Sequence, residues 1–596
     1  MKLSGQDASL GGDARESRLP RRGIAFVAAM FVVPFLLPYH RFPLTSYFSE
    51  WLALVLGIGA LTVLWGRRSR EGLALPRIAL LPLALAAILG VQAVLGMVPY
   101  AGQALAAIAY LVWASALIVL AAVLEREAGS EAIVRVLAWS LVVGGLLSAL
   151  AALIQHYYGS SWFIGPLVAR KSGNHEVYGN LGQRGHFANY ITLALFSVAY
   201  LRSRQYLRWG AALVLCLPML FVLGLSGSRI AWLFLLWGVG LSLAMWLAQR
   251  GSRAIRGLAA CLGMTLIGFV GVQEIASLSS LVPAGGAITA TERLFAESTG
   301  PSERIQLWTE SWWAFLRAPV FGWGWGGFPT MHFEYQAGHT TVAGHDPYHQ
   351  AHNLVLQLMV ETGAAGTLLV VGGTLAWLWG LRRQIFSLER WWQLAVLGVL
   401  AVHSMSEFPL WYSYFLGVTA ILLGLGGAPR APAAWASSLR PLVAALSVLG
   451  SFYLVYNYSA YRDFERIFVG KGSGLEDHAA QSRGVARALS DPILRPYGEL
   501  AIAFSTAVEP DRVAQRLALV RRASRFAPYY PIVYKQAMLL AMAGEQKAAV
   551  DELVRAKHVY PQEWPPIRAQ ITELAARYPG RFEALLSDDR RKHGEE

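Results

Sequence analysis

Length, composition and charge restrict this chain to one broad class of protein. It has 596 residues, of which 55% are hydrophobic and only 15% charged, and its mean hydropathy of +0.42 excludes an ordinary soluble protein. The formal net charge is +14, but the arginines occur in short clusters between apolar runs, which indicates membrane topology and argues against a nucleic-acid partner. Cys216 and Cys261 lie inside apolar runs, so the sequence predicts no disulfide framework, no metal site and no cofactor.

Apolar runs of about 17 to 25 residues recur from Arg22 to Tyr458 and lack the alternation of β-strands. Such runs satisfy their backbone hydrogen bonds internally when they form helices. We therefore predict an all-α, polytopic membrane protein with about thirteen transmembrane helices. The predicted parts are a cytoplasmic N-terminal arm (1–22), a transmembrane domain (23–458) and a periplasmic helical domain (459–596).

The side on which each loop lies follows from the positions of Lys and Arg, because short basic loops stay in the cytoplasm. Basic clusters predicted on the inside include Arg67–Arg70, Arg202–Arg208, Arg250–Arg256 and Arg382–Arg390. In contrast, the predicted outside turns 96–103 and 404–413 contain neither Lys nor Arg. The N-terminus is therefore predicted inside, and everything after Tyr458 outside.

Two predicted outside loops are long, residues 155–186 and 273–351. The first is rich in Gly, His and aromatic residues, and the second contains the Trp/Gly stretch Gly322–Gly327. Loops longer than about 15 residues are usually functional or disordered. The glycine and aromatic content of both loops favours ordered, functional segments.

After Tyr458 the pattern becomes that of soluble helices. The stretch Ala527–Gly544 leads into Lys547–Ala556, and a second Tyr-Pro pair follows at Tyr560-Pro561. This is close to the pattern of a tetratricopeptide (TPR) unit, although a small helical bundle would give the same pattern. In either case we expect a docking or stabilising domain.

The candidate catalytic residues centre on the segment 346–366, at the start of a predicted membrane helix. His349 and His352 are three residues apart, Asn353 follows, and the apolar run begins at about Leu354. Imidazole exchanges protons near neutral pH, so His352 at the outer mouth of a helix bundle is a candidate general base. The alternative is an interfacial histidine hydrogen-bonded to a loop. For His349 the choice is between a partner of His352 and an exposed loop histidine.

Two arginines are candidates for binding an anion. Arg229 lies at a short junction between two predicted spans, and Arg304 lies in the second long loop. Guanidinium groups bind phosphates through two parallel hydrogen bonds. The alternatives are a snorkelling Arg229 and an exposed helical Arg304 lying over Trp308. Lys171 and Arg184 add positive charge on the same side.

A cationic outer pocket beside a histidine suits a polyprenyl-diphosphate sugar, whose diphosphate lies at the membrane surface and whose tail stays in the bilayer. Arginines would stabilise the leaving diphosphate without a metal, and His352 would deprotonate a hydroxyl acceptor. Residues 23–458 would then be the catalytic domain. A flippase or exporter of lipid-linked sugars is the alternative from another class, but it predicts ionisable residues at mid-membrane, and here they collect at one end.

Three further side chains have two interpretations each. Glu407, at an outside end, would orient a base or bind sugar hydroxyls, or else cap a helix or pair with an arginine. Trp323 and Trp325 would stack on sugars, or instead hold a loop at the membrane interface.

Several motifs resemble those of a known family. His352-Asn353, followed by Gly363 and Gly366-Thr367, is similar to the signature of the O-antigen ligase and polymerase (Wzy/WaaL) superfamily of lipid-linked glycan transferases. The runs Gly179–Asn189 and His403–Gly417 resemble the pilin-type protein O-oligosaccharyltransferases (PglL/PilO-like), including their soluble C-terminal region. The resemblance covers nearly the whole chain. In the first of these two runs, the Gln-Arg-Gly-His form departs from the expected Gln-Pro-Asn-His form.

The resemblance implies a GT-C-like ligase fold in the bacterial inner membrane and a metal-independent, inverting glycosyltransferase. It would move a glycan en bloc from undecaprenyl diphosphate to a periplasmic hydroxyl, above all Ser or Thr of an acceptor protein such as pilin. O-antigen ligation to lipid A-core and glycan polymerisation share this chemistry and remain alternatives. Together with the reasoning above it gives candidate catalytic residues His352, His349 and Glu407; diphosphate-binding residues Arg229, Arg304, Lys171 and Arg184; and glycan- or acceptor-binding residues Gln183, His186, Asn353, Trp323 and Trp325.

Overall fold

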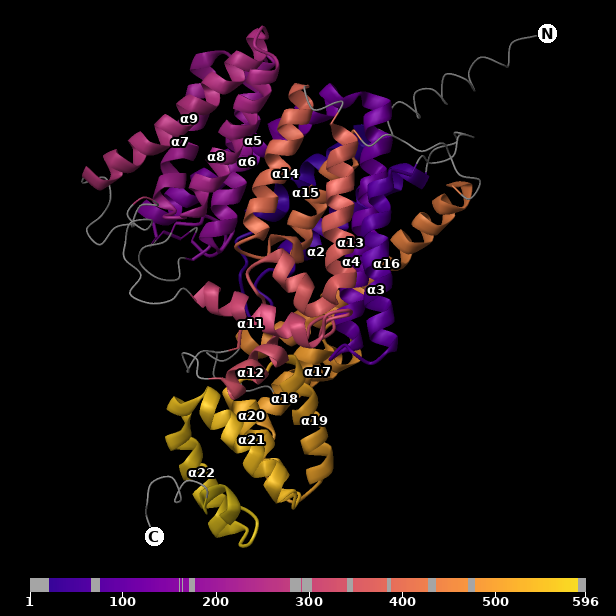
Figure 1. The fold of residues 1–596 in the computed structure, drawn as a ribbon, viewed down its shortest axis with the longest axis vertical. Helices are drawn as coiled ribbons and strands as arrows, with labels where there is room; N and C mark the ends of the chain where they lie inside the picture. The colour runs from indigo at the N-terminus through magenta and orange to yellow at the C-terminus, as the bar shows by residue number, and fades with distance from the viewer. Residues whose placement is uncertain are drawn as a thin grey trace, which may run out of the picture. The chain divides into compact units, whose positions relative to one another are not determined.

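The described part of the chain is helical (Figure 1). The computed structural model describes residues 21–65, 75–159, 161–162, 164–170, 177–278, 291, 303–339, 347–382, 387–426, 436–469 and 478–587. These residues contain no β-strand, only an isolated bridge between Ile164 and Val168. The predicted all-α class is therefore confirmed.

The chain divides into two compact units. Unit 1 comprises Met1–Ala84, Tyr110–Gly300 and Val370–Tyr456, and unit 2 comprises Leu85–Ala109, Pro301–Leu369 and Asn457–Glu596. Helices of unit 1 are α2 (Tyr47–Trp65), α5 (Ser130–Tyr157), α6 (Arg184–Ser203), α7 (Trp209–Leu225), α8 (Ile230–Ala248), α9 (Arg253–Leu278), α14 (Leu388–Ser404) and α15 (Ser413–Gly424). Helices of unit 2 are α11 (Glu303–Arg317), α12 (Phe328–Gly338), α17 (His478–Ser490), α18 (Arg495–Ser505), α19 (Val513–Phe526), α20 (Tyr530–Met542), α21 (Gln546–Val559) and α22 (Trp564–Arg577). Four helices contribute residues to both units: α3 (Leu80–Val94), α4 (Ala101–Ala128), α13 (Leu354–Leu381) and α16 (Ala436–Val469).

Seven of the described helices are long and apolar enough to cross a membrane, and three shorter apolar helices accompany them. They confirm a polytopic membrane protein, whereas the span count of about thirteen stays a prediction. The first predicted span, 23–38, is interrupted: a helix over 21–30 is followed by a turn and a 3-10 helix at Val33–Leu36. Pro34 lies in the first turn of the 3-10 helix and lacks the N–H that would continue an α-helix.

Helix α6 is the central helix of unit 1. Nearly all its side chains are buried, because it packs against α5, α7, α8, α9 and α14. Tyr200, near its C-terminal end, hydrogen-bonds Glu389 at the start of α14 (3.0 Å). Near its N-terminal end, Asn189 hydrogen-bonds His403 at the end of α14 (2.9 Å). Helices α6 and α14 are therefore antiparallel neighbours.

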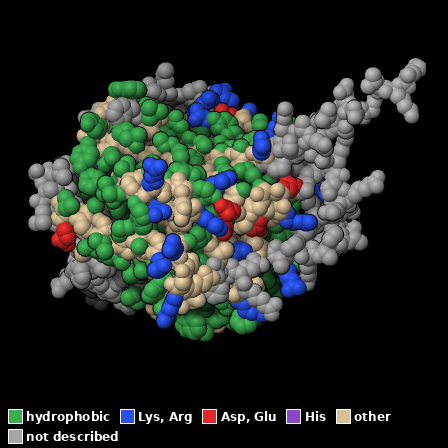
Figure 2. Space-filling view, turned by 90° about the horizontal axis from the view of Figure 1, so that it is seen from above, with side chains coloured by type: hydrophobic (Ala, Val, Ile, Leu, Met, Phe, Trp, Pro, Cys, Tyr) green, Lys and Arg blue, Asp and Glu red, His purple; other side chains and the backbone are tan. Residues whose placement is uncertain are grey.

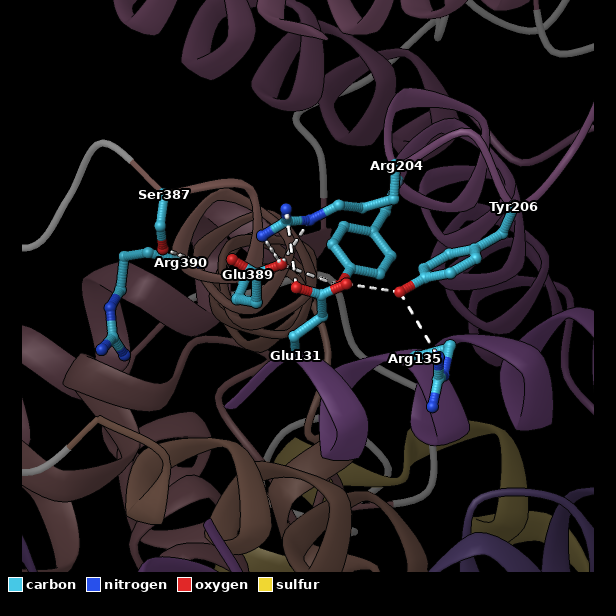
Figure 3. Close-up of polar contacts among 8 residues, drawn as sticks. Glu131, Arg135, Arg204, Tyr206, Ser387, Glu389 and Arg390 are labelled. Carbon is cyan, nitrogen blue, oxygen red and sulfur yellow. Dashed lines mark hydrogen bonds and ion pairs between the residues drawn. The ribbon is translucent and has the colours of Figure 1, made fainter. Parts of the chain in front are cut away.

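Two segments that were predicted on the cytoplasmic side, Arg202–Arg208 and Arg382–Arg390, meet each other and the start of α5 in unit 1 (Figure 3). Glu389 accepts a hydrogen bond from Arg204 Nε at 2.7 Å. Glu131, at the start of α5, lies 3.6 Å from Arg204 Nη1 and accepts a hydrogen bond from the Tyr206 hydroxyl. Lys and Arg side chains also gather among apolar ones on the face shown in Figure 2. The ends of α5, α6 and α14 lie together, as the predicted alternation of loops requires.

The two predicted long loops contain more regular structure than expected. Helix α5 continues to Tyr157 and α6 begins at Arg184, so the first loop is shorter than 155–186. The second, 273–351, begins inside α9 and contains α11 and α12. Both α11 and α12 bury one side against neighbouring helices, which is why these segments form helices outside the apolar runs.

In unit 2, α12 packs against α19 and α21 of the predicted C-terminal domain. The Thr330 hydroxyl donates to the carbonyl of Arg525 at 2.8 Å, and His558 Nε2 donates to the carbonyl of His339 at 2.9 Å. Phe333 belongs to the same hydrophobic core as α19 to α21. Residues 459–469 and 478–587 therefore share one packed unit with part of the segment 273–351. The identification of these helices as a tetratricopeptide repeat remains a prediction.

Candidate active site

His352 occupies a tightly determined position immediately before α13. Asn353 Oδ1 accepts hydrogen bonds from the backbone N–H groups of Val355 (3.0 Å) and Leu356 (3.2 Å), which caps the helix. The Gln357 side chain accepts from the N–H of Ala351 at 2.6 Å. His352 itself has φ +49°, a left-handed conformation that is uncommon for residues other than glycine. Hydrogen bonds fix the neighbours Ala351 and Asn353, so they also fix the position of the His352 backbone from which the imidazole projects.

Tyr348 lies beside the His352 ring. The two rings meet edge-on, with centroids 6.0 Å apart and planes at 82°. The Tyr348 hydroxyl donates to Glu303 Oε2 at 2.6 Å. Burial, together with the hydrogen bond to Glu303, raises the pKa of Tyr348 to about 12. Tyr348 therefore stays protonated at neutral pH and ties the His352 segment to the first turn of α11.

Tyr348 also contacts a buried pair of side chains that was not predicted from the sequence. Its ring meets that of His332 with centroids 5.6 Å apart, and His332 Nδ1 lies 2.5 Å from Glu310 Oε2. The exposed fractions of the two side chains are only 2% and 0%. Gln336 Nε2 lies 3.2 Å from His332 Nε2, so both ring nitrogens of His332 have a polar partner. A glutamate on the face of α11 that also holds Leu307 was the available signal.

His349 lies in a different environment from His352. Its Nε2 is 3.3 Å from the Tyr529 hydroxyl, and its ring lies near Phe526. These residues belong to the end of α19 and the loop before α20. This contact holds the segment to the C-terminal helices, a role that neither interpretation of His349 included. A catalytic role for His349 stays a prediction.

The Trp/Gly stretch packs where α13 is broken. Gly363 has φ +62° and ψ −159° inside α13. The N–H of Trp323 donates to the carbonyl of Val360 at 2.7 Å, and that of Ala364 donates to Pro319 at 2.7 Å. Backbone from the loop therefore satisfies groups that the broken helix leaves without partners.

The two tryptophans of this stretch are held by specific contacts. Trp323 Nε1 donates to the carbonyl of Ala314 at 3.0 Å, and its ring stacks against Trp313. The N–H of Trp325 donates to Gln92 Oε1 at 3.2 Å. These contacts favour loop anchoring for Trp323, and sugar stacking by either ring stays a prediction.

Candidates from the other motifs gather in unit 1. Gln183 Nε2 donates to Glu407 Oε2 at 3.3 Å, which joins the two motifs across 224 residues. A Cβ on Gly185 would lie 3.3 Å from His403 Nε2, so the glycine allows this close approach. His186 is only 3% exposed, packed among rings that include His403, whereas Arg184 begins α6 and is partly exposed. Gln183 and Glu407 are therefore more accessible candidates than His186.

Buried amides hold this motif in place, and the sequence analysis did not identify them. Asn180 Nδ2 donates to the carbonyls of Leu36 (2.7 Å) and Leu167 (2.9 Å). Gln155 accepts from the N–H groups of Tyr178 and Gly179, at 3.2 Å and 3.1 Å. Asparagine and glutamine within a glycine-rich run were the only sequence signal for this scaffold.

The remaining candidates are separate from these clusters. Arg229 is exposed and lies in the turn between α7 and α8, after Gly227 with φ +59°. Arg304 is exposed in the first turn of α11, and Lys171 lies outside the described residues. His352 and Arg304 belong to unit 2 and Arg229 to unit 1, so the convergence of all three stays a prediction. The described residues contain no group of three or more His, Cys, Asp or Glu side chains that could hold a metal ion.

Fold and site together define a polytopic helical membrane protein with a histidine-centred candidate active site. Residues 211–371 match the family described as O-antigen ligase, and residues 391–573 match the family described as the C-terminal part of a virulence factor membrane-bound polymerase. Two proteins of Acinetobacter baylyi are similar to the chain. A general O-oligosaccharyltransferase is 25% identical over 404 residues, which is 67% of this chain and 69% of the relative. A ComP-specific O-oligosaccharyltransferase is 25% identical over 300 residues, 50% of this chain and 52% of the relative.

The chain thus belongs to the O-antigen ligase superfamily, close to the pilin-type O-oligosaccharyltransferases. It is a membrane-bound transferase of glycans.

Proposed function

We propose that this chain transfers a glycan en bloc from undecaprenyl diphosphate to a hydroxyl of Ser or Thr in a periplasmic protein, such as a pilin. The observation that carries the proposal is the position of His352 at the start of α13. It lies between Asn353, which caps the helix, and Ala351, whose N–H is hydrogen-bonded to Gln357. The relatives are named as O-oligosaccharyltransferases, one of them ComP-specific, which supports a protein acceptor. The chain would lie in the inner membrane, with its N-terminus in the cytoplasm and its C-terminal helices in the periplasm.

In the proposed reaction, His352 takes the proton of the acceptor hydroxyl as the oxygen attacks the anomeric carbon. The bond between that carbon and the diphosphate oxygen breaks, and undecaprenyl diphosphate leaves. Attack opposite the leaving group inverts the anomeric centre. Arg229 and Arg304 stabilise the charge that develops on the diphosphate, and the step needs no metal.

Transfer by the purified chain from a lipid-linked glycan to an acceptor protein tests the base. His352→Ala should abolish transfer while thermal unfolding stays unchanged. Gln515→Ala, which truncates an exposed polar side chain on α19, is the control and should remain active. Full transfer by the His352→Ala protein would refute the proposed role.

The arginines are tested by keeping their charge and changing their geometry. Arg304→Lys and Arg229→Lys retain a cation but lose the planar fork. A hydrogen bond to a charged group contributes about 1.5–3 kcal/mol, so each variant should lose roughly tenfold or more in kcat/KM. Cysteines at 229 and 304 should also be joined by a short bifunctional maleimide. Failure of every such cross-link would show that one diphosphate does not bridge the two positions.

The family descriptions also favour testing two related acceptors. Ligation of O-antigen to lipid A-core and polymerisation of the glycan share the proposed chemistry. Glycoprotein mass spectrometry and lipopolysaccharide gels, compared between a deletion strain and its parent, separate the three. Loss of protein glycans with intact lipopolysaccharide supports the protein acceptor, and the reverse result refutes it.

A further inference from the structure

Helix α11 exposes an apolar stripe on the side opposite its buried face, although it lies between the predicted spans. One face is buried within unit 2 and includes Leu307 and Ala314. Side chains spaced three or four residues apart share one side of a helix, and such a set lies on the opposite face. Its members are exposed: Ile305, Trp308, Trp312 and Leu316. Trp312 is 53% exposed and Leu316 is 62% exposed, which is unusual for a surface in contact with water.

This exposed stripe continues beyond the helix into a candidate membrane span. Val320 and Phe321 follow α11 and are 59% and 38% exposed. The carbonyl of Phe321 accepts a hydrogen bond from Gln92 Nε2 of α3 at 2.7 Å, and α3 is part of a candidate span. On either side of the buried Gln92, Val91 and Val94 are 46% and 88% exposed. The segment that follows α11 is therefore bonded to a candidate span that itself exposes apolar side chains.

The residues around the stripe are those that occur at a membrane–water boundary. Tryptophan is enriched there because its ring is apolar while its N–H is polar. Arg304 lies one turn before Trp308 and is exposed, and Arg317 is exposed in the last turn, with its guanidinium 4.0 Å from the centre of the Trp313 ring. Long basic side chains of this kind lay their stems on apolar surface and keep their charge among headgroups.

We propose that α11 is an interfacial helix whose exposed stripe is inserted among the lipids at the bilayer surface. The occupant of the stripe is lipid, because the stripe adjoins a candidate span and carries the tryptophans and arginines typical of the headgroup region. This assigns a membrane contact to a segment that the sequence placed in a long outside loop, residues 273–351. A consequence, which rests on the proposed function, is that α11 holds Arg304 at the depth of a lipid-linked diphosphate.

Spin labels on the full-length chain in phosphatidylethanolamine–phosphatidylglycerol nanodiscs test this contact. The native cysteines are buried and are replaced by alanine. Single labels are placed at Trp312→Cys and Leu316→Cys, with Ile305→Cys as a substitute if either protein fails to fold. Thr572→Cys, exposed on α22, is the matched control outside the stripe. Collision with oxygen, which partitions into lipid, is compared with collision with a water-soluble nickel chelate.

The labels on the stripe should collide mainly with oxygen, and the label at 572 mainly with the nickel chelate. A nickel-favoured ratio at 312 and 316 would show that the stripe faces water. Occlusion of both labels from both reagents would show that protein covers the stripe. Either result overturns the proposal. Glycan transfer is not measured here, so the outcome is independent of the His352→Ala test.

Discussion

Replacing Gly363 by alanine should destabilise the protein at the break in α13. The backbone there has φ +62° and ψ −159°, a region that is nearly exclusive to glycine and costs other residues about 1–3 kcal/mol. A Cβ would also lie 2.4 Å from the carbonyl oxygen of Val320. Because that atom is backbone, no side-chain rotation relieves the overlap.

The segment that must move also supplies hydrogen bonds. The N–H groups of Ala364 and Ala365 donate to Pro319 (2.7 Å) and Val320 (3.1 Å). Losing two such bonds costs about 1 kcal/mol each. Together with the backbone cost, Gly363→Ala should lower the free energy of unfolding by about 3–5 kcal/mol.

Thermal unfolding of the purified chain in one detergent measures this effect. Gly372→Ala is the matched control, because it lies on the same helix and no described atom would come within 4 Å of its Cβ. Alanine is the better helix former by up to about 1 kcal/mol, so this control should unfold at the same temperature or slightly higher. Equal unfolding temperatures for the two variants would refute the reasoning.

Three further predictions concern unit 2. Glu310→Gln removes the charge beside His332, so it should lower the free energy of unfolding by about 1–3 kcal/mol and reduce glycan transfer. The control Thr309→Ala changes the exposed neighbouring residue and should alter neither quantity. Unaltered unfolding of the Glu310→Gln protein would contradict this prediction. His349→Ala should reduce transfer by up to roughly tenfold without abolishing it, and a dead but folded protein would restore His349 as a catalytic candidate. Although burial raises the pKa of Glu499, hydrogen bonds from two arginines and a tyrosine hold it below the ordinary 4.5. The ionised Glu499 therefore contributes its full stabilisation above pH 4.5, and this contribution is lost as the pH falls through the lower pKa of the folded state. Glu499→Gln should make the free energy of unfolding less dependent on pH, measured from about pH 6 to pH 3.

The candidate site shows where local pattern was sufficient and where it was not. His352 and Asn353 were identified from their position before an apolar run, because a polar pair at a helix start is a local feature. The roles of the neighbouring residues were not visible in this way. The sequence offers His349 as a catalytic partner, and it gives no sign of the contact that His349 makes with Tyr529, 180 residues away.

Membrane class, helical fold and the alternation of basic loops were available from the sequence alone. Hydropathy and the positions of Lys and Arg are properties of each segment by itself, so these features can be predicted without knowing how the helices pack. Gly363 and Gly372 illustrate the limit. Both are glycines on α13, yet only Gly363 has a positive φ and lies close to the backbone of another segment.

Only the tertiary structure decided which polar side chains meet. The Glu310–His332 pair, the Gln183–Glu407 contact and the Arg204–Glu389 contact join residues 22, 224 and 185 positions apart. Such pairs form because the packing of the helices brings their polar groups together, and each hydrogen bond satisfies groups that are wholly or partly removed from water. The sequence determined which segments enter the membrane, and the packing of those segments determined the partners of their polar groups.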